Sequence, residues 1–143
     1  MKEAESGNPV EDIFEKFEEY LGLISEDGIT LCSLDEKFTA VLTSRMETDG
    51  SEIEHMLTYG TLSEGTKDTI SLAFRLAMLE HIFPDGDGLA VFDDPFTDMD
   101  PGRVRQACRL IERFAEKNQV IFLTCDEKYR ELLHGGNLIC GQP

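Results

Sequence analysis

The chain has little positive charge. It holds 13 lysine and arginine residues against 29 aspartates and glutamates, a formal net charge of −16 over 143 residues. Binding to nucleic acid draws much of its free energy from cationic contacts to phosphate, so we do not expect this chain alone to bind DNA. The length predicts one domain, in which roughly two thirds of the unfolded surface becomes buried.

The cysteines show no metal-binding or disulfide pattern. Cys32, Cys108, Cys125 and Cys140 lie far apart, with no Cys-x-x-Cys spacing. This argues against a zinc site and a disulfide framework, and it fits a reducing, cytoplasmic location best. No stretch approaches the roughly 18 apolar residues of a membrane span, and the polar N-terminus lacks the hydrophobic segment of a signal peptide.

The first predicted helix covers residues 9 to about 21. Residues 1–8 are expected to be a disordered leader or a non-native remnant, and Pro9 suits a first helical turn. The apolar residues that follow recur at the spacing of one face of an amphipathic helix: Val10, Ile13, Phe14, Phe17, Tyr20 and Leu21.

A small β hairpin is expected next. Residues 29–34 and 38–43 are predicted to be its strands, joined at residues 35–37. Residues 45–51 are predicted to form a polar turn region, and a short segment over residues 53–57 leads to the next helix.

A helix N-terminus suited to an anion is predicted near residues 62–68. Thr61 and Ser63 are N-cap candidates, and Gly65 removes side-chain bulk where a ligand would approach the backbone. The dipole of the helix over residues 64–83 adds partial positive charge there. An ordinary cap explains the same residues. The helix is apolar nearly all round and is therefore expected to be buried.

Two carboxylates end a short apolar run. The run over residues 89–95 shows no alternation, as is typical of a buried parallel strand, and it ends in Asp93, Asp94 and Pro95. Ligands of open α/β sheets gather at the carboxyl ends of such strands. Asp93 can hold Mg²⁺ directly or through water, and Asp94 can orient or deprotonate an attacking water. A solvated turn is the alternative reading.

The remaining chain alternates helix and strand. Asp100 is a predicted N-cap, and a helix runs to about residue 117. Residues 119–124 form a second apolar strand, residues 126–133 a short helix and residues 138–140 a last strand. This order predicts an α/β fold with a parallel sheet packed between helices.

The helix after Asp100 has two predicted faces. Arg105, Arg109 and Arg113 recur along one of them, which could touch nucleic acid but is more often solvated. The buried face is expected to hold Val104, Ala107, Cys108, Ile111, Phe114 and Ala115.

Four motifs in order resemble those of ABC-type ATPases. Residues 62–67, Leu-Ser-Glu-Gly-Thr-Lys, resemble the signature motif Leu-Ser-x-Gly-x, and residues 89–94 are similar to a Walker B strand. Residues 97–100 match the D-loop, whose family pattern is Ser-x-Leu-Asp. Residues 119–124 resemble the strand before the switch histidine. With residues 9–24 as the stump of a coiled coil, residues 9–143 resemble the C-terminal lobe of an SMC-like or double-strand-break-repair ATPase head.

The resemblance implies a role in ATP hydrolysis with Mg²⁺. Two heads of this family sandwich two ATP molecules, and hydrolysis opens the dimer. DNA is then a partner of the full assembly, in repair or chromosome maintenance. The implied site residues are Asp93 at the metal, Asp94 at the attacking water, Ser63, Gly65 and Lys67 at the phosphate held by the opposite head, Asp98 and Asp100 at the dimer seam, and Cys125 or Asp126 at the switch position.

Three departures from the family pattern stand out. No Gly-x-x-x-x-Gly-Lys-Ser/Thr loop occurs in the chain, so an N-terminal lobe from the same longer protein or a separate polypeptide must supply it. We expect an exposed apolar sheet edge where that lobe packs. At the switch position, where the family has histidine, this chain has Cys125 or Asp126, and neither can supply a positive charge. Asp94 stands where most of the family has glutamate.

Two other functions remain open. A degenerate lobe with this fold could sense nucleotide or bind a protein without hydrolysis. An unrelated metal-dependent hydrolase could use Asp93, Asp94, Asp98 and Asp100.

Overall fold

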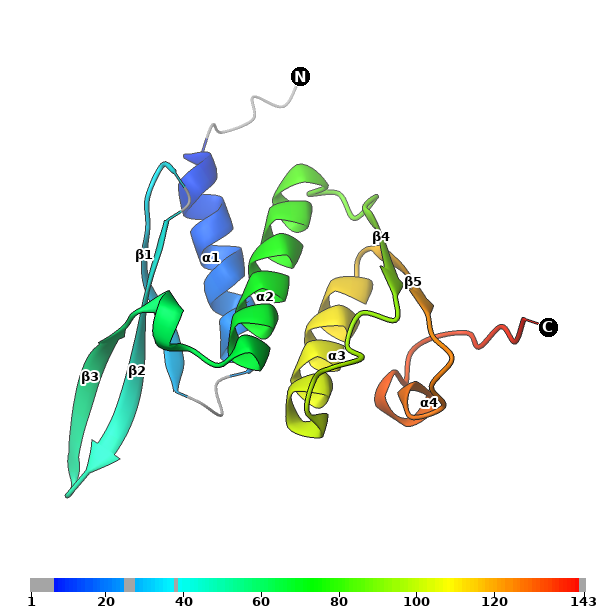
Figure 1. The fold of residues 1–143 in the computed structure, drawn as a ribbon. Coiled ribbons are helices and arrows are strands. Elements are labelled where there is room, and N and C mark those ends of the chain that lie inside the picture. Colours follow the sequence, from blue (N-terminus) through cyan, green and yellow to red (C-terminus); the bar gives the residue numbers. More distant parts are fainter. Residues whose placement is uncertain (1–6, 25–27, 38, 142–143) are drawn as a thin grey trace.

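Three helices lie side by side between two small sheets (Figure 1). The structure, a computed structural model, describes residues 7–24, 28–37 and 39–141. The elements follow in the order α1 (Pro9–Gly22), β1 (Ile29–Leu34), β2 (Ala40–Thr48), β3 (Ser51–Leu57), a 3-10 turn η2 (Tyr59–Thr61), α2 (Glu64–Ile82), β4 (Leu89–Asp93), α3 (Pro101–Ala115), β5 (Gln119–Leu123) and α4 (Tyr129–Leu132).

Helix α1 begins where the sequence predicted. Pro9 occupies the first turn, and the Asn8 side chain accepts a hydrogen bond from the Val10 amide at 3.1 Å, which caps the helix. Asn8 therefore belongs to the helix start rather than to a leader, and residues 1–6 lie outside the described residues. The predicted stripe holds the buried side chains of Ile13, Phe17, Tyr20 and Leu21.

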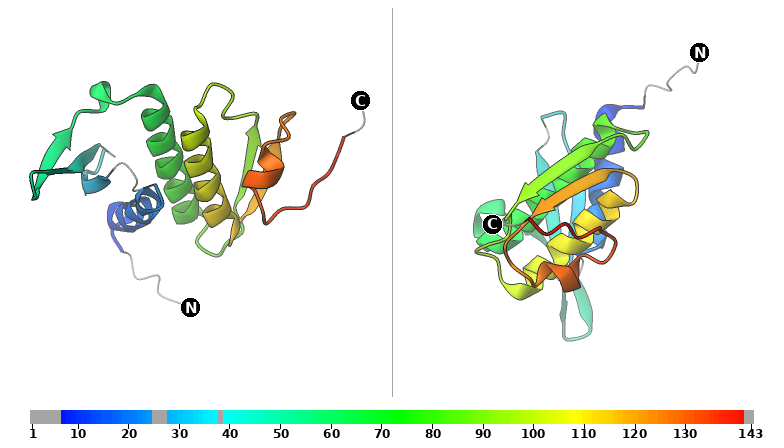
Figure 2. Two further views of the ribbon diagram at one scale, coloured as in Figure 1. Left: turned by 90° about the horizontal axis from the view of Figure 1, so that it is seen from below. Right: turned by 90° about the vertical axis from the view of Figure 1, so that its right-hand side faces the viewer.

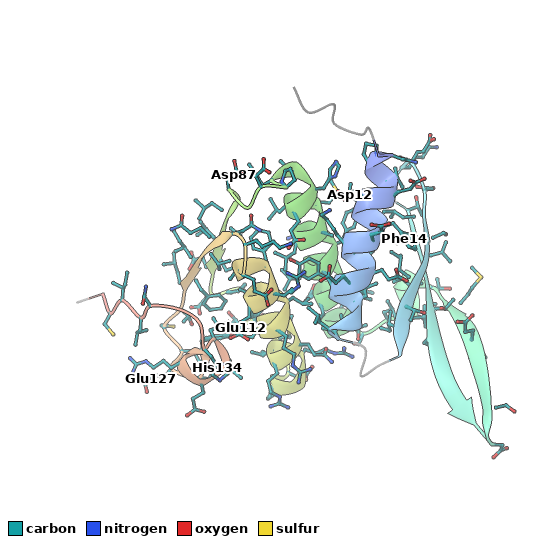
Figure 3. The ribbon with its side chains drawn as sticks, turned by 180° about the vertical axis from the view of Figure 1, so that it is seen from behind. Asp12, Phe14, Asp87, Glu112, Glu127 and His134 are labelled. Atoms are coloured by element: carbon teal, nitrogen blue, oxygen red, sulfur yellow. The ribbon has the colours of Figure 1, made fainter. Side chains whose placement is uncertain are left out.

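Polar contacts tie α1 to α2. The buried Tyr20 hydroxyl donates to Glu80 Oε1 at 2.8 Å, and burial raises the pKa of Tyr20 well above its ordinary value. Nearer the start of α1, Asp12 Oδ2 lies 2.6 Å from His81 Nδ1 (Figure 3). These contacts fix α1 along the length of α2.

The first sheet is larger than the predicted hairpin. It is an antiparallel meander in the order β1-β2-β3, and the polar turn expected over residues 45–51 is wrong. Strand β2 continues to Thr48, which pairs with Ser51, and only Asp49 and Gly50 form the turn. Both turn residues have positive φ, 51° and 76°, as an Asp-Gly hairpin turn requires. Phe38, the predicted start of β2, lies outside the described residues.

Helix α2 is the middle helix of the three. It packs against α1 on one side and α3 on the other (Figure 2, left). Ala73 and Ala77 are fully buried, and their small side chains allow close approach of the neighbouring helices. The predicted burial of this helix is thus confirmed for the faces that meet α1 and α3.

Helix α3 differs from the prediction at its C-terminus. It ends at Ala115, whose side chain is exposed and not buried as expected, because this residue closes the last turn. Arg113 does not lie in a solvated stripe: it forms ion pairs with Glu19 of α1 and, at 3.2 Å, with Glu116.

The second sheet is parallel but covered on one face only. Strands β4 and β5 pair in parallel, and Ala90, Phe92, Val120 and Phe122 face the helices. On the other face the apolar side chains are exposed: Leu89 by 50%, Val91 by 57%, Ile121 by 40% and Leu123 by 49%. Figure 2 (right) shows the two strands in front of the helices. The predicted burial between two helical layers is therefore wrong for this chain. The exposed apolar side chains lie on a face of this sheet, whereas the sequence predicted an exposed apolar edge.

The C-terminal segment forms no strand. Residues 138–140, predicted as the last strand, are irregular because no strand of the described chain lies beside them, and Leu138 and Ile139 are exposed. The His134 amide donates to Glu112 Oε1 at 2.7 Å, which holds the segment after α4 against α3 (Figure 3). Within the described residues, no helix has both the length and the apolar character needed to cross a membrane.

A matched pair of leucine substitutions tests this packing. Leu76 is 1% exposed and Leu89 is 50% exposed. We expect Leu76→Ala to lower the free energy of unfolding by about 2–5 kcal/mol, because it leaves a cavity between the helices. Leu89→Ala should change it by less than about 1 kcal/mol. Urea unfolding followed by circular dichroism measures both, and equal losses would contradict the described core.

Candidate functional site

The carboxyl end of β4 carries the two predicted carboxylates. Asp93 is the last residue of the strand and is exposed. Asp94 follows with φ of 41°, in the left-handed region that aspartate tolerates better than most residues. Its amide donates to the Leu123 carbonyl at 2.8 Å, so the pairing with β5 extends one residue past the strand. The backbone is therefore fixed at the point where both carboxylates leave the sheet.

The Asp94 carboxylate lies against the end of β5. Thr124 Oγ1 donates to Asp94 Oδ1 at 2.7 Å, and Cys125 Sγ donates to Asp94 Oδ2 at 3.4 Å. These hydrogen bonds, the one from Thr124 first, hold the pKa of Asp94 below its usual range. The same contact raises the pKa of the Cys125 thiol, because the bonded carboxylate disfavours a thiolate beside it. At neutral pH the pair is a carboxylate and a thiol.

The two candidates for the switch position have different surroundings. Cys125 contacts Asp94, whereas the Asp126 carboxylate accepts from the Lys128 amide at 3.0 Å and pairs with Lys128 Nζ at 2.8 Å. The bond to Lys128 also lowers the pKa of Asp126. Cys125 is thus the member of the pair that the structure brings into contact with the Asp94 carboxylate.

The tip of α2 is capped by its own side chains. Ser63 Oγ accepts from the Thr66 amide at 3.2 Å and lies 2.7 Å from Thr66 Oγ1. Lys67 Nζ pairs with Glu64 at 2.8 Å. The ordinary-cap reading of this sequence therefore holds in the structure. The Ser63 side chain is nevertheless exposed at the helix end.

The α2 tip adjoins the start of α3. A Cβ on Gly65 would lie 3.4 Å from Arg103 Cγ and 3.7 Å from Asp100 Oδ2, which is ordinary van der Waals contact. None of the described residues therefore requires glycine at this position. Asp100 Oδ1 caps α3 by accepting from the Gly102 and Arg103 amides at 3.0 and 3.1 Å. Asp98 is exposed in the preceding loop.

All these groups lie at one end of the molecule. The N-termini of α2 and α3 and the carboxyl end of β4 point the same way in Figure 1. This end of the molecule therefore carries two helix N-termini, with their partial positive charge, and the strand end that bears Asp93 and Asp94.

The aspartates do not converge on one point. Among the described residues, no three histidine, cysteine, aspartate or glutamate side chains are grouped so that they could hold a metal ion. The metal-dependent hydrolase with Asp93, Asp94, Asp98 and Asp100 as a self-contained centre has no support in this arrangement.

Sequence reasoning missed two threonines. Thr124 binds the Asp94 side chain, and Thr97 Oγ1 donates to the Asp94 carbonyl at 2.9 Å. A signal for Thr124 was available: it directly follows the second apolar strand, and the ends of adjacent parallel strands meet at one sheet edge.

By sequence, no protein-family model and no curated protein matches the chain. The fold does match solved structures. One comes from work on ATP-driven dimerization and DNA-stimulated activation of SMC ATPases; the match has a TM-score of 0.55 and 23% identity, and it covers 82% of this chain and 70% of that one.

Two longer head structures match as well. The Smc head bound to the C-winged helix domain of ScpA gives a TM-score of 0.55 at 22% identity, over 82% of this chain and 35% of that one. The Smc head domain with an extended coiled coil, bound to the C-terminal domain of ScpA from Pyrococcus furiosus, gives 0.52 at 22% identity, over 86% and 29%. The chain thus spans about a third of these two structures. The similarity to SMC-like heads that the motifs indicated is confirmed for the fold.

The Asp94–Cys125 contact can be tested through thiol chemistry. Asp94→Asn removes the charge that raises the pKa of Cys125, and asparagine tolerates positive φ, so more thiolate should form. We expect alkylation of Cys125 by iodoacetamide at about pH 8 to become several-fold faster.

Peptide mapping measures this rate, with two controls in the same chain. Asp93→Asn removes the neighbouring carboxylate and should leave Cys125 unchanged, and the exposed Cys140 should react equally in all variants. Equal Cys125 rates in Asp94→Asn and the wild type would rule out the contact.

Proposed function

We propose that this chain is the C-terminal lobe of an SMC-like ATPase head, completed by an N-terminal lobe that carries the P-loop. One observation carries the proposal: Asp93 and Asp94 leave the end of a parallel strand within a fold shared with SMC heads. The α1 helix, residues 9–22, then corresponds to the stump of the coiled coil.

The uncovered face of the second sheet is the proposed docking surface for the P-loop lobe. Parallel sheets are normally covered on both faces, and two strands alone are few for a stable sheet. Here the outward face carries four exposed apolar side chains, those of Leu89, Val91, Ile121 and Leu123, with Val91 directly opposite Ile121. An apolar surface of this kind marks a protein contact.

In the completed head, Asp93 would hold Mg²⁺ of the bound nucleotide. A single exposed carboxylate suits an ion that keeps several waters and binds phosphate oxygens of its ligand. The ion would neutralise charge on the ATP phosphates. Asp94, held as a carboxylate by Thr124 and Cys125, orients the attacking water.

The helix tips would act across a head dimer. Ser63, Gly65 and Lys67 meet the nucleotide held by the opposite head, since a helix N-terminus suits a phosphate. Asp100 lies beside Gly65. Asp98 and Asp100 would lie at the dimer seam, and Cys125 would take the switch position. In this proposal ATP joins the heads, and hydrolysis separates them.

The assembly would work in chromosome maintenance or DNA repair in the cytoplasm. DNA would be contacted by other parts of it, because this chain carries a net charge of −16 and repels phosphate.

A second candidate keeps the fold without the hydrolysis. Cys125 is not a cation and Asp94 is one methylene shorter than glutamate, so a nucleotide-sensing or protein-binding lobe accounts for both departures. The two candidates differ in turnover: the sensing lobe would bind ATP in the completed head and release it unchanged.

Exchange of Asp94 tests the proposed function. In a head assembled from this chain and its P-loop polypeptide, we expect Asp94→Asn to lower kcat for ATP hydrolysis by ~10² to 10⁴-fold, as loss of a general base does. ATP binding should persist, so the variant should accumulate as an ATP-bound dimer in size-exclusion chromatography. Undiminished turnover would exclude Asp94 as the base, and a wild-type head that binds ATP without turnover would favour the sensing lobe.

The docking surface has its own test. Val91→Glu and Ile121→Glu place a carboxylate in the uncovered face and should weaken binding of the P-loop polypeptide by about 100-fold or more, because burying an unpaired charge is costly. Met56→Glu is the control: Met56 is 77% exposed on β3, on the opposite side of the molecule (Figure 1). Titration calorimetry measures all three, and equal affinities would contradict docking at this face.

A further inference from the structure

The Thr124 hydroxyl is fixed in direction by two hydrogen bonds. Its oxygen accepts from the Asp126 amide at 3.0 Å and donates to Asp94 Oδ1 at 2.7 Å. A hydroxyl has one proton, and an amide can only donate to it, so the proton must point at the carboxylate. The turn after β5 therefore sets the direction of this donor.

The other carboxylate oxygen has a donor from the same turn. Cys125 Sγ lies 3.4 Å from Asp94 Oδ2, and a thiol is a weak donor beside a hydroxyl. The backbone of Asp94 is held as well, because its amide binds the Leu123 carbonyl and its carbonyl accepts from Thr97. Both ends of the residue and both side-chain oxygens are thus constrained.

We infer that Thr124 and Cys125 are positioning residues for the attacking water, and that they act by aiming the Asp94 carboxylate, with Thr124 the stronger of the two. This inference rests on the proposed role of Asp94 in hydrolysis. An ionised carboxylate has about four acceptor sites, so two donors leave sites for a water molecule.

The orientation of the carboxylate matters more for Asp94 than it would for a glutamate. The aspartate side chain is one methylene shorter and has fewer torsions with which to reach the water, while a misplacement of about 1 Å can cost about 10²-fold in rate. Neutral donors on both oxygens keep the carboxylate in one orientation without a cation at position 125.

Variants at Thr124 distinguish an effect on the orientation of the Asp94 carboxylate from an effect on folding. In the head assembled with the P-loop polypeptide, we expect Thr124→Val, which keeps the shape and loses the donor, to lower kcat by about 10 to 100-fold with KM for ATP unchanged. Thr124→Ser keeps the hydroxyl and should restore most of the rate. Cys125→Ala should have a smaller effect than Thr124→Val.

The control is Thr58→Val, the same exchange at an exposed threonine outside the site, which should leave kcat unchanged. Steady-state ATPase kinetics and urea unfolding of each variant give the readout. Equal kcat in Thr124→Val and the wild type, or a loss in Thr124→Ser as large as in Thr124→Val, would overturn the positioning role. A wild-type head without turnover would instead overturn the proposed function.

Discussion

The parallel pairing of β4 with β5 determines the arrangement of the candidate site. Its register sets Asp93 opposite Leu123, so the residues that follow each strand leave the sheet side by side. This is why Asp94 meets Thr124 and Cys125, although 30 and 31 residues separate them in the chain. The positive φ of Asp94 and its amide bond to Leu123 extend the same pairing into the turn. A shift of the register by one residue would move the carboxylate away from both donors.

Local signals explain why much of the fold could be predicted from sequence. Ser63 and Asp100 mark helix starts as caps, and Pro9 marks one by its place in the first turn. These signals act within a few residues, and the structure places each of them there. The failures depend on contacts that are distant in sequence. Residues 138–140 are apolar enough for a strand, yet they have no strand beside them in the described chain. The turn over residues 45–51 failed for a different reason, since Asp49 and Gly50 suffice for it and polar residues on either side continue as strands.

The residues of the candidate site also fall into two groups: those that one segment of the sequence identifies, and those that depend on contacts distant in sequence. The sequence located Asp93 and Asp94, because an apolar run that stops at two acids is visible in one segment. The sequence could not decide between Cys125 and Asp126 as the candidate for the switch position. Their surroundings differ because Lys128 holds the Asp126 carboxylate, whereas Asp94, which follows β4, contacts Cys125. Thr124 was overlooked because its role appears only when the ends of two strands are brought together.

The uncovered face and the candidate site belong to the same two strands. Side chains alternate along each strand, so the register that brings Asp94 to Thr124 also lines up Leu89, Val91, Ile121 and Leu123 on the outward face. A lobe that covered this face would pack directly on the strands that end in Asp93 and Asp94. In the proposed head, the P-loop would then be delivered by the same contact that buries the apolar surface. The same docking event would then bury the apolar surface and complete the nucleotide site. The favourable free energy of that burial would hold the P-loop in place beside Asp93 and Asp94.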